Sequence, residues 1–257
     1  MSAPNLIVLD VETAPLEVYS WGLWKQNIGL NQIVCEWSLL SFAYKRLGEK
    51  TIHYFDNRNE DDPRDDNSLL EELWHVLDEA DIVIAQNGRA FDMKRIYARM
   101  AMHDYLPPSP VRVVDTLVEA RRAFGFTSNK LEWMSAHLTC AKKTKHEKFP
   151  GFELWSQCLK GNFAAWNEMK KYNMADVLAT EELYLKLRPW IKHPNMASFQ
   201  EDERELCPRC GSDNIQYRGN AVTDAGVYKR VCCNSCNGWS RTKKNLLTKD
   251  KRKALLA

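Results

Sequence analysis

Long apolar runs and several common active-site patterns are missing from this 257-residue sequence. No stretch approaches the roughly 18 apolar residues of a membrane span, and no positively charged start precedes an apolar run as in a signal peptide. The sequence has no phosphate-binding glycine loop, dinucleotide fingerprint or Ser-His-Asp arrangement, and its six histidines lack metal-ligand spacing. We therefore expect a soluble, cytoplasmic protein whose chemistry depends on other groups.

The length of the chain exceeds that of a usual single domain. A hydrophobic content of 44% supports a sizeable core, so one large domain with a small module is the expected division. We predict a large domain over residues 1–190, a linker over 191–205, a cysteine-rich module over 206–240 and a basic tail over 241–257.

The overall charge of +2 hides an asymmetry between the two ends of the chain. From Cys207 to the end there are 11 Lys and Arg against 3 Asp and Glu, a net +8, which leaves −6 for residues 1–206. An acidic part suits cation binding and a basic part suits a polyanion, so nucleic acid is the simplest partner that accounts for both.

Four cysteines occur as two pairs with two-residue spacing: Cys207, Cys210, Cys233 and Cys236. This spacing indicates a structural zinc ribbon with four thiolate ligands. The alternative is two disulfides, which the missing signal peptide disfavours because it implies a reducing compartment. Cys232 breaks the two-residue spacing and is left out of the set.

Four carboxylates and one tyrosine form the second candidate site. Asp10 and Glu12 end an apolar strand, where two-residue spacing places both side chains on one face. Asp92 lies where a strand gives way to a helix, and Tyr172 and Asp176 share a helix face at four-residue spacing. Carboxylates brought together need cations to stay ionised, and hard oxygen ligands suit Mg²⁺ or Mn²⁺.

Strand and helix patterns alternate along the large domain. Strands are expected at 6–9, 33–45, 50–56, 82–85 and 111–115, and helices at 69–80, 91–102 and thereafter. The stretch 13–32 is loop-like and 57–67 is a polar turn region. This alternation predicts an α/β fold with a central mixed sheet covered by helices.

Three sequence motifs together resemble the tyrosine branch of the DEDD superfamily of 3′-to-5′ exonucleases. The motifs are LDVET at 9–13, the run from Asn87 to Asp92, and the run from Tyr172 to Asp176. The second motif is most similar to the proofreading domains of family B DNA polymerases. The resemblance covers roughly residues 5–190 and implies an RNase H-like fold.

The same resemblance implies a two-metal exonuclease that releases nucleoside 5′-monophosphates from the 3′ end of DNA, with unpaired ends preferred. In the family arrangement Asp10 bridges two Mg²⁺ or Mn²⁺ ions, Glu12 and Asp176 complete one site, and Asp92 supports the other through water. Tyr172 would orient the attacking water, because an unperturbed phenol is a poor base at neutral pH. Two alternatives stay open: a 3′-to-5′ exoribonuclease, and a non-catalytic nucleic-acid-binding adaptor.

Candidate substrate contacts surround these motifs. Relatives hold the terminal nucleotide near the positions of Thr13, Asn87 and Phe91. Trp21 and Trp24 can stack on unpaired bases or, at three-residue spacing, lie in the core of a short helix; both interpretations stay open. The next candidates begin a helix whose amides could receive a phosphate: Ser128, Asn129 and Lys130. Asp115 we interpret as a helix N-cap and not as a fifth ligand.

The expected partner is nucleic acid with a free 3′ end, and a replication or repair protein is a further candidate. Polymerase palm and finger segments are missing from the sequence, so any proofreading would act in trans. The stretch 19–33 resembles stand-alone phage exonucleases, which would place the protein in the cytoplasm of a bacterial host.

Overall fold

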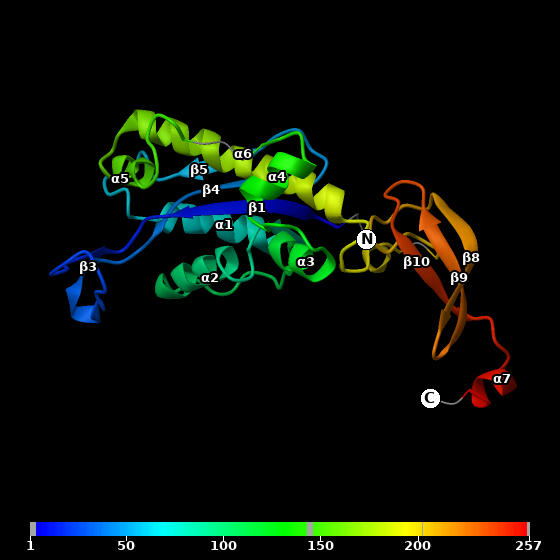
Figure 1. Cartoon of the computed structure of the whole chain (residues 1–257). Helices are drawn as coiled ribbons and strands as arrows, with labels where there is room; N and C mark the ends of the chain where they lie inside the picture. Colours follow the sequence, from blue (N-terminus) through cyan, green and yellow to red (C-terminus); the bar gives the residue numbers. More distant parts are fainter. Residues whose placement is uncertain (1–3, 143–145, 202, 256–257) are drawn as a thin grey trace. The chain divides into compact units, whose positions relative to one another are not determined.

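The computed structural model describes residues 4–142, 146–201 and 203–255, which belong to two compact units. The large unit spans residues 5–184, and the small unit begins at residue 185 (Figure 1). None of the helices in these described ranges is long and apolar enough to cross a membrane. The domain limits expected at 190, 205 and 240 stay predictions.

A five-stranded mixed sheet forms the centre of the large unit, in the order β5-β4-β1-β6-β7. Its strands are β1 (Leu6–Thr13), β4 (Leu39–Arg46), β5 (His53–Asp56), β6 (Ile82–Ala85) and β7 (Arg112–Asp115). β1 runs antiparallel to β4 and parallel to β6, while β5 is antiparallel to β4 and β7 is parallel to β6. The expected mixed sheet is therefore confirmed.

Helices cover both faces of this sheet (Figure 1). One side carries α1 (Asn67–Asp78), α2 (Asp92–Met102) and α3 (Thr116–Ala123), and the other carries α4 (Leu131–Leu138), α5 (Glu153–Leu159) and α6 (Phe163–Leu187). Two apolar clusters join these layers. One packs β1 and β4 against α1 and α2, and the other packs Leu40 against α5 and α6.

Alternation along β1 decides where its carboxylates point. Ile7, Leu9 and Val11 lie in the cluster with α1 and α2. Successive side chains of a strand point to opposite faces, so Asp10 and Glu12 lie on the face covered by α5 and α6. The hydrophobic pattern of the strand therefore aims both carboxylates at the helix that carries Tyr172 and Asp176.

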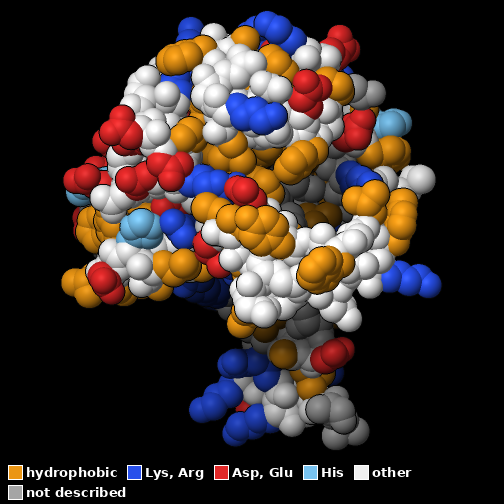
Figure 2. All heavy atoms as spheres, turned by 90° about the vertical axis from the view of Figure 1, so that its left-hand side faces the viewer, with side chains coloured by type: hydrophobic (Ala, Val, Ile, Leu, Met, Phe, Trp, Pro, Cys, Tyr) orange, Lys and Arg blue, Asp and Glu red, His pale blue; other side chains and the backbone are white. Residues whose placement is uncertain are grey.

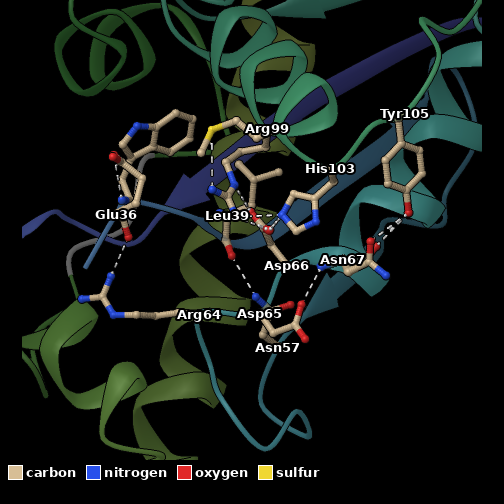
Figure 3. A network of polar contacts seen from close by, with 12 residues as sticks. Glu36, Leu39, Asn57, Arg64, Asp65, Asp66, Asn67, Arg99, His103 and Tyr105 are labelled. Carbon is tan, nitrogen blue, oxygen red and sulfur yellow. Dashed lines mark hydrogen bonds and ion pairs between the residues drawn. The ribbon is translucent and has the colours of Figure 1, made fainter. Parts of the chain in front are cut away.

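A buried aspartate organises the stretch that the sequence presented as a polar turn (Figure 3). Asp66 is fully buried and accepts hydrogen bonds from the Leu39 amide at 2.8 Å and from Arg99 Nε and Nη2, each at 2.7 Å. His103 Nε2 lies 3.1 Å from Asp66 Oδ1. The network connects α1, β4 and α2, so the turn region is part of the framework that holds the start of β4.

The expected strand over 33–45 is wrong as one element, because the structure divides it into β3 (Ile33–Cys35) and β4. Arg64 Nη1 donates to the backbone carbonyls of Glu36 at 3.1 Å and Pro15 at 3.0 Å, which occupies backbone groups at the break. β3 pairs with β2 (Glu17–Val18), and a short 3₁₀ helix precedes it at Leu30–Gln32. Residues 16–35 form an arm at one end of the sheet (Figure 1).

The small unit contains a three-stranded antiparallel sheet in the order β10-β9-β8. Its strands are β8 (Ile215–Thr223), β9 (Gly226–Cys233) and β10 (Trp239–Asn245), followed by α7 (Lys249–Lys253). A 3₁₀ helix at Met196–Phe199 lies within the predicted linker, where the Met196 amide donates to the Pro208 carbonyl at 2.9 Å. The first part of the predicted basic tail belongs to β10.

Candidate metal centres

Three carboxylates from two elements converge in the large unit. Asp10 and Glu12 of β1 and Asp176 of α6 each offer a ligand oxygen, and these atoms all lie within 4.8 Å of one another. Asp176 is 2% exposed, while Asp10 and Glu12 are half-buried. Such a set of hard oxygen donors fits a divalent cation of the Mg²⁺ type, because close carboxylates repel one another without one.

Asp92 approaches the same strand from the start of α2. Its Oδ1 accepts a hydrogen bond at 3.2 Å from the amide of Val11, the residue between Asp10 and Glu12. Burial raises the pKa of the Asp92 carboxyl to about 7, with a smaller contribution from Asp115, while the Val11 amide acts in the opposite direction. A cation near this carboxyl would favour its ionised form.

Tyr172 lies one helical turn before Asp176 on α6. Its ring packs edge-on against the rings of His146 and Trp155, with centroids 5.2 and 6.1 Å away. Trp155 Nε1 in turn donates a hydrogen bond to Glu12 Oε2 at 3.1 Å. The indole therefore connects the tyrosine to the first motif, and nothing in the sequence spacing of Trp155 or His146 signalled this role.

Asn173 holds Asp10 from α6. Its Nδ2 donates to Asp10 Oδ2 at 2.6 Å and to the Asp10 carbonyl at 3.2 Å, and its Oδ1 accepts from Ser41 Oγ at 3.3 Å. The side chain is fully buried. Sequence reasoning missed this residue, although a polar side chain next to Tyr172 on a helix packed against a sheet was a usable signal.

Asp115 supports the second motif from β7. Its carboxylate accepts hydrogen bonds from the amides of Leu117 and Val118, which confirms the N-cap interpretation. The same carboxylate accepts from the amides of Asn87 at 3.1 Å and Arg89 at 3.0 Å. Asn87 has a left-handed φ of 67°, so these bonds fix the tight turn that leads into Asp92.

Gly88 allows this turn to pack closely on the sheet. A Cβ at this position would lie 2.5 Å from the Ala85 Cβ, closer than two carbon atoms can approach. A side chain at residue 88 would therefore displace the turn and, with it, the start of α2 that carries Asp92.

The residues predicted to contact the substrate lie in different parts of the large unit. Thr13 ends β1 beside a register shift at Glu12, and Phe91 packs against the core with α1 and α2. The Asn129 carbonyl accepts from Gln86 Nε2 at 2.9 Å, next to Asn87, and Lys130 is the N-cap of α4 without a side-chain capping bond. Ser128 Oγ accepts from the Lys130 amide at 3.3 Å. These contacts place residues 128–130 beside the second motif.

Trp21 and Trp24 are not core residues of a short helix. Trp21 is 98% exposed and Trp24 is 83% exposed, in a non-helical part of the arm. Figure 2 faces this end of the large unit and shows hydrophobic side chains on its surface. The helical interpretation is therefore wrong, because the chain here is held by Gln32, whose Nε2 donates to the Tyr19 carbonyl at 2.9 Å, and not by apolar packing.

The four paired cysteines converge in the small unit. Their sulfur atoms all lie within 4.8 Å of one another, with Cys207 Sγ 3.6 Å from Cys236 Sγ and Cys210 Sγ 3.6 Å from Cys233 Sγ. These separations are too long for disulfides and close to the roughly 3.8 Å edge of a tetrahedron with metal–sulfur bonds of about 2.3 Å. A zinc ion fits this set, and Cys232 lies outside it.

Comparison with known proteins agrees with the fold. A solved structure of the family B DNA polymerase from the hyperthermophilic archaeon Pyrobaculum calidifontis superposes with a TM-score of 0.51 at 14% identity. The similarity covers 72% of this chain and 25% of the polymerase chain, so this chain matches about a quarter of its length. No curated protein matches the chain.

The family of the chain follows from its match to a family model. Residues 35–188 match the model of the RNase_H superfamily, a range that includes Asp92, Tyr172 and Asp176 and begins after Asp10 and Glu12. These residues lie on β1 of the mixed sheet and on α2 and α6, which cover its two faces. The chain belongs to the RNase_H superfamily.

Proposed function

We propose that this chain is a metal-dependent 3′-to-5′ exonuclease that hydrolyses single-stranded DNA to nucleoside 5′-monophosphates. The observation that carries the proposal is the convergence of Asp10, Glu12 and Asp176, with Asp92 bonded to the strand between the first two. A chain that only bound nucleic acid would not need this complete ligand set. The superfamily assignment adds a nuclease fold.

Four carboxylates would hold two Mg²⁺ or Mn²⁺ ions: Asp10, Glu12, Asp92 and Asp176. Bound divalent cations supply a lowered pKa for the attacking water and charge stabilisation for the leaving 3′ oxygen. Asn173 orients Asp10 through its amide, and Trp155 orients Glu12 through its indole N–H. These donors fix the rotation of each carboxylate, which is the usual role of outer partners of metal ligands.

Tyr172 would orient the attacking water through its hydroxyl. Phenols as a class are poor bases at neutral pH, so positioning is the suitable task for this hydroxyl. The Tyr172 ring packs against the rings of His146 and Trp155, which also contact each other and so restrict its movement. The hydroxyl is thereby kept on the α6 face that also presents Asp176.

The preference for DNA rests on the likeness of the fold to a DNA polymerase. The arm over 16–35 would stack on unpaired bases through Trp21 and Trp24, because these indoles are exposed on a segment that follows the first motif in the chain. Thr13, Asn87, Phe91 and residues 128–130, which precede α4, would contact the terminal nucleotide.

In the small unit, zinc at the four cysteines would be structural, since four thiolates close a tetrahedral shell. Lys and Arg side chains gather at the lower end of Figure 2, and α7 supplies Lys249, Lys251, Arg252 and Lys253. These side chains would contact phosphates. A replication or repair protein is the proposed protein partner, and the cytoplasm of a phage-infected bacterium is the proposed place of action.

The test uses single-stranded DNA and RNA of matched sequence, labelled at the 5′ end, with Mg²⁺ or Mn²⁺. The wild type is expected to shorten the DNA progressively from its 3′ end and to release 5′-monophosphates, whereas Asp10→Ala is expected to be inactive. Activity that persists in purified Asp10→Ala protein would refute the proposal. Faster degradation of the RNA strand would replace DNA by RNA as the substrate.

A further inference from the structure

A cavity of about 520 Å³ lies within the small unit, beside the four-cysteine centre, whose Cys236 is one of the residues that line it. Its walls are the segment 185–190, which includes the end of α6, and residues 235–239, which include Cys236 of the second cysteine pair. The volume is in the range of small-ligand pockets. We call it the indole pocket, because Trp190 and Trp239 are the two largest side chains in its lining.

Arg209 holds the two walls of the indole pocket together. Its Nη1 donates to the carbonyls of Arg188, at 3.3 Å, and of Ile191. Gly238 packs directly on the Arg209 side chain, where a Cβ would lie 2.4 Å from Arg209 Cδ. The close approach at Gly238 therefore helps to fix the spacing between the two walls.

The aromatic lining of the pocket is open to solvent. Trp190 is 69% exposed and Trp239 is 45% exposed. The Arg230 guanidinium lies 5.2 Å from the centroid of the Trp239 ring, which supports that ring by a cation–π contact. Two exposed indoles around one cavity offer flat surfaces on which a planar group can stack.

The charged lining of the pocket has one sign. Lys186 and Arg188 contribute to it, and none of the lining residues is Asp or Glu. The chain from Cys207 onward adds a net charge of +8. Aromatic side chains combined with cations are the usual way of binding an unpaired base and the phosphates next to it.

We propose that the indole pocket binds an unpaired nucleobase of a single-stranded nucleic acid. Trp190 and Trp239 stack on the base, and Lys186 and Arg188 contact the neighbouring phosphates. The choice of nucleic acid rests on the proposed function, whereas the pocket itself does not depend on catalysis. It gives the strand a second point of attachment, so long substrates are held more tightly than short ones.

The experiment measures binding of fluorescent oligonucleotides by anisotropy, with every protein carrying Asp10→Ala so that the strand stays intact. Oligothymidylate, oligouridylate and an abasic strand of equal length are compared. Trp190→Ala is expected to weaken binding of the two base-containing strands by about fivefold or more and to leave the abasic strand unchanged. Lys186→Glu is expected to weaken binding of all three.

Lys50→Glu is the matched charge control, because Lys50 is exposed in the turn after β4, at the opposite end of β1 from Asp10 and Glu12. It is expected to bind all three strands like the parent protein. Trp190→Leu keeps an apolar side chain without the ring and is expected to behave like Trp190→Ala. Thermal unfolding of each variant shows whether it is folded. If Trp190→Ala does not fold, the proposal is judged from the binding measured with Trp190→Leu and Lys186→Glu.

Equal binding of both oligothymidylate and oligouridylate by the parent protein and Trp190→Leu would overturn the proposal, as would an equal loss on the abasic strand. Lys50→Glu losses as large as those of Lys186→Glu would overturn the phosphate contacts. A loss on oligothymidylate alone assigns the pocket to DNA, and a loss on oligouridylate alone assigns it to RNA. The nuclease activity of the protein without Asp10→Ala is measured separately, so its failure would refute the proposed function and leave the pocket standing.

Discussion

Replacement of Asn173 by Ala removes the donors that α6 presents to Asp10. The amide lies 2.6 Å from Asp10 Oδ2, which is the distance of a strong hydrogen bond to a charged acceptor, and the side chain is fully buried. Water does not readily replace a donor at such a site. Asp10 would then face the carboxylates of Glu12 and Asp176 with its orientation no longer fixed by this amide.

The size of the effect follows from two contributions. A hydrogen bond to a charged group contributes about 1.5 to 3 kcal/mol, and loss of an outer partner of a metal ligand typically costs about 10- to 100-fold in metal affinity or activity. We therefore expect Asn173→Ala to need roughly 10 to 100 times more Mn²⁺ for half-maximal hydrolysis. Part of the rate should return at saturating Mn²⁺, because the carboxylate ligands themselves remain.

The assay is a Mn²⁺ titration of hydrolysis of a short DNA strand. Asn167→Ala is the control, because Asn167 is exposed on the same helix and its Oδ1 accepts from Arg58 Nη1 at 2.7 Å, away from the carboxylates. An identical Mn²⁺ dependence in the two variants would refute the positioning role of Asn173.

Three further outcomes are expected. Trp155→Phe keeps a ring against Tyr172 but loses the donor to Glu12, so its rate at limiting Mn²⁺ should fall by about tenfold. Trp133, which stacks on His137 within α4, is the control, and Trp133→Phe should match the wild type. Asp66→Ala leaves Arg99 without its buried partner and should lower the free energy of unfolding, measured in urea, by about 3 to 5 kcal/mol. Asp65→Ala, at an exposed position, is the control. An equal loss in the two variants would contradict the role of Asp66 in the network of Figure 3. Cys236→Ser should abolish zinc binding, measured by metal analysis, and unfold β8–β10, yet leave hydrolysis of a short strand intact; retained zinc would show that the four thiolates are not its ligands.

The sequence alone was enough to predict those site residues whose placement depends only on their position within one strand, one helix or one short motif. Asp10 and Glu12 could be placed on one face of a strand by alternation, and Asp176 on a helix face by its spacing from Tyr172. The four-cysteine set could also be predicted, because two cysteines with two residues between them are a short sequence pattern typical of zinc sites. These sets are the ones that the structure brings together.

Other parts of the site depend on contacts between distant residues. Trp155 reaches Glu12 across 143 positions and Asn173 reaches Asp10 across 163, and no local pattern encodes such pairs. Asp66 lies in a run of charged residues that reads as solvated surface, but Arg99 on another helix compensates its burial. The exposure of Trp21 and Trp24 could not be predicted either, because the helical spacing of two indoles does not show whether other apolar side chains pack against them.

Anomalous diffraction from crystals grown with Mn²⁺ tests the central claim most directly. The expected result is an anomalous peak at about 2.0 to 2.2 Å from carboxylate oxygens of Asp10, Glu12 and Asp176, the metal–oxygen distance of a small divalent cation. The same crystals of Asp10→Ala protein should lack that peak. Hydrolysis of DNA by the wild type in the same Mn²⁺ buffer, with no peak at these three residues, would contradict the assignment of this cluster as the catalytic metal centre.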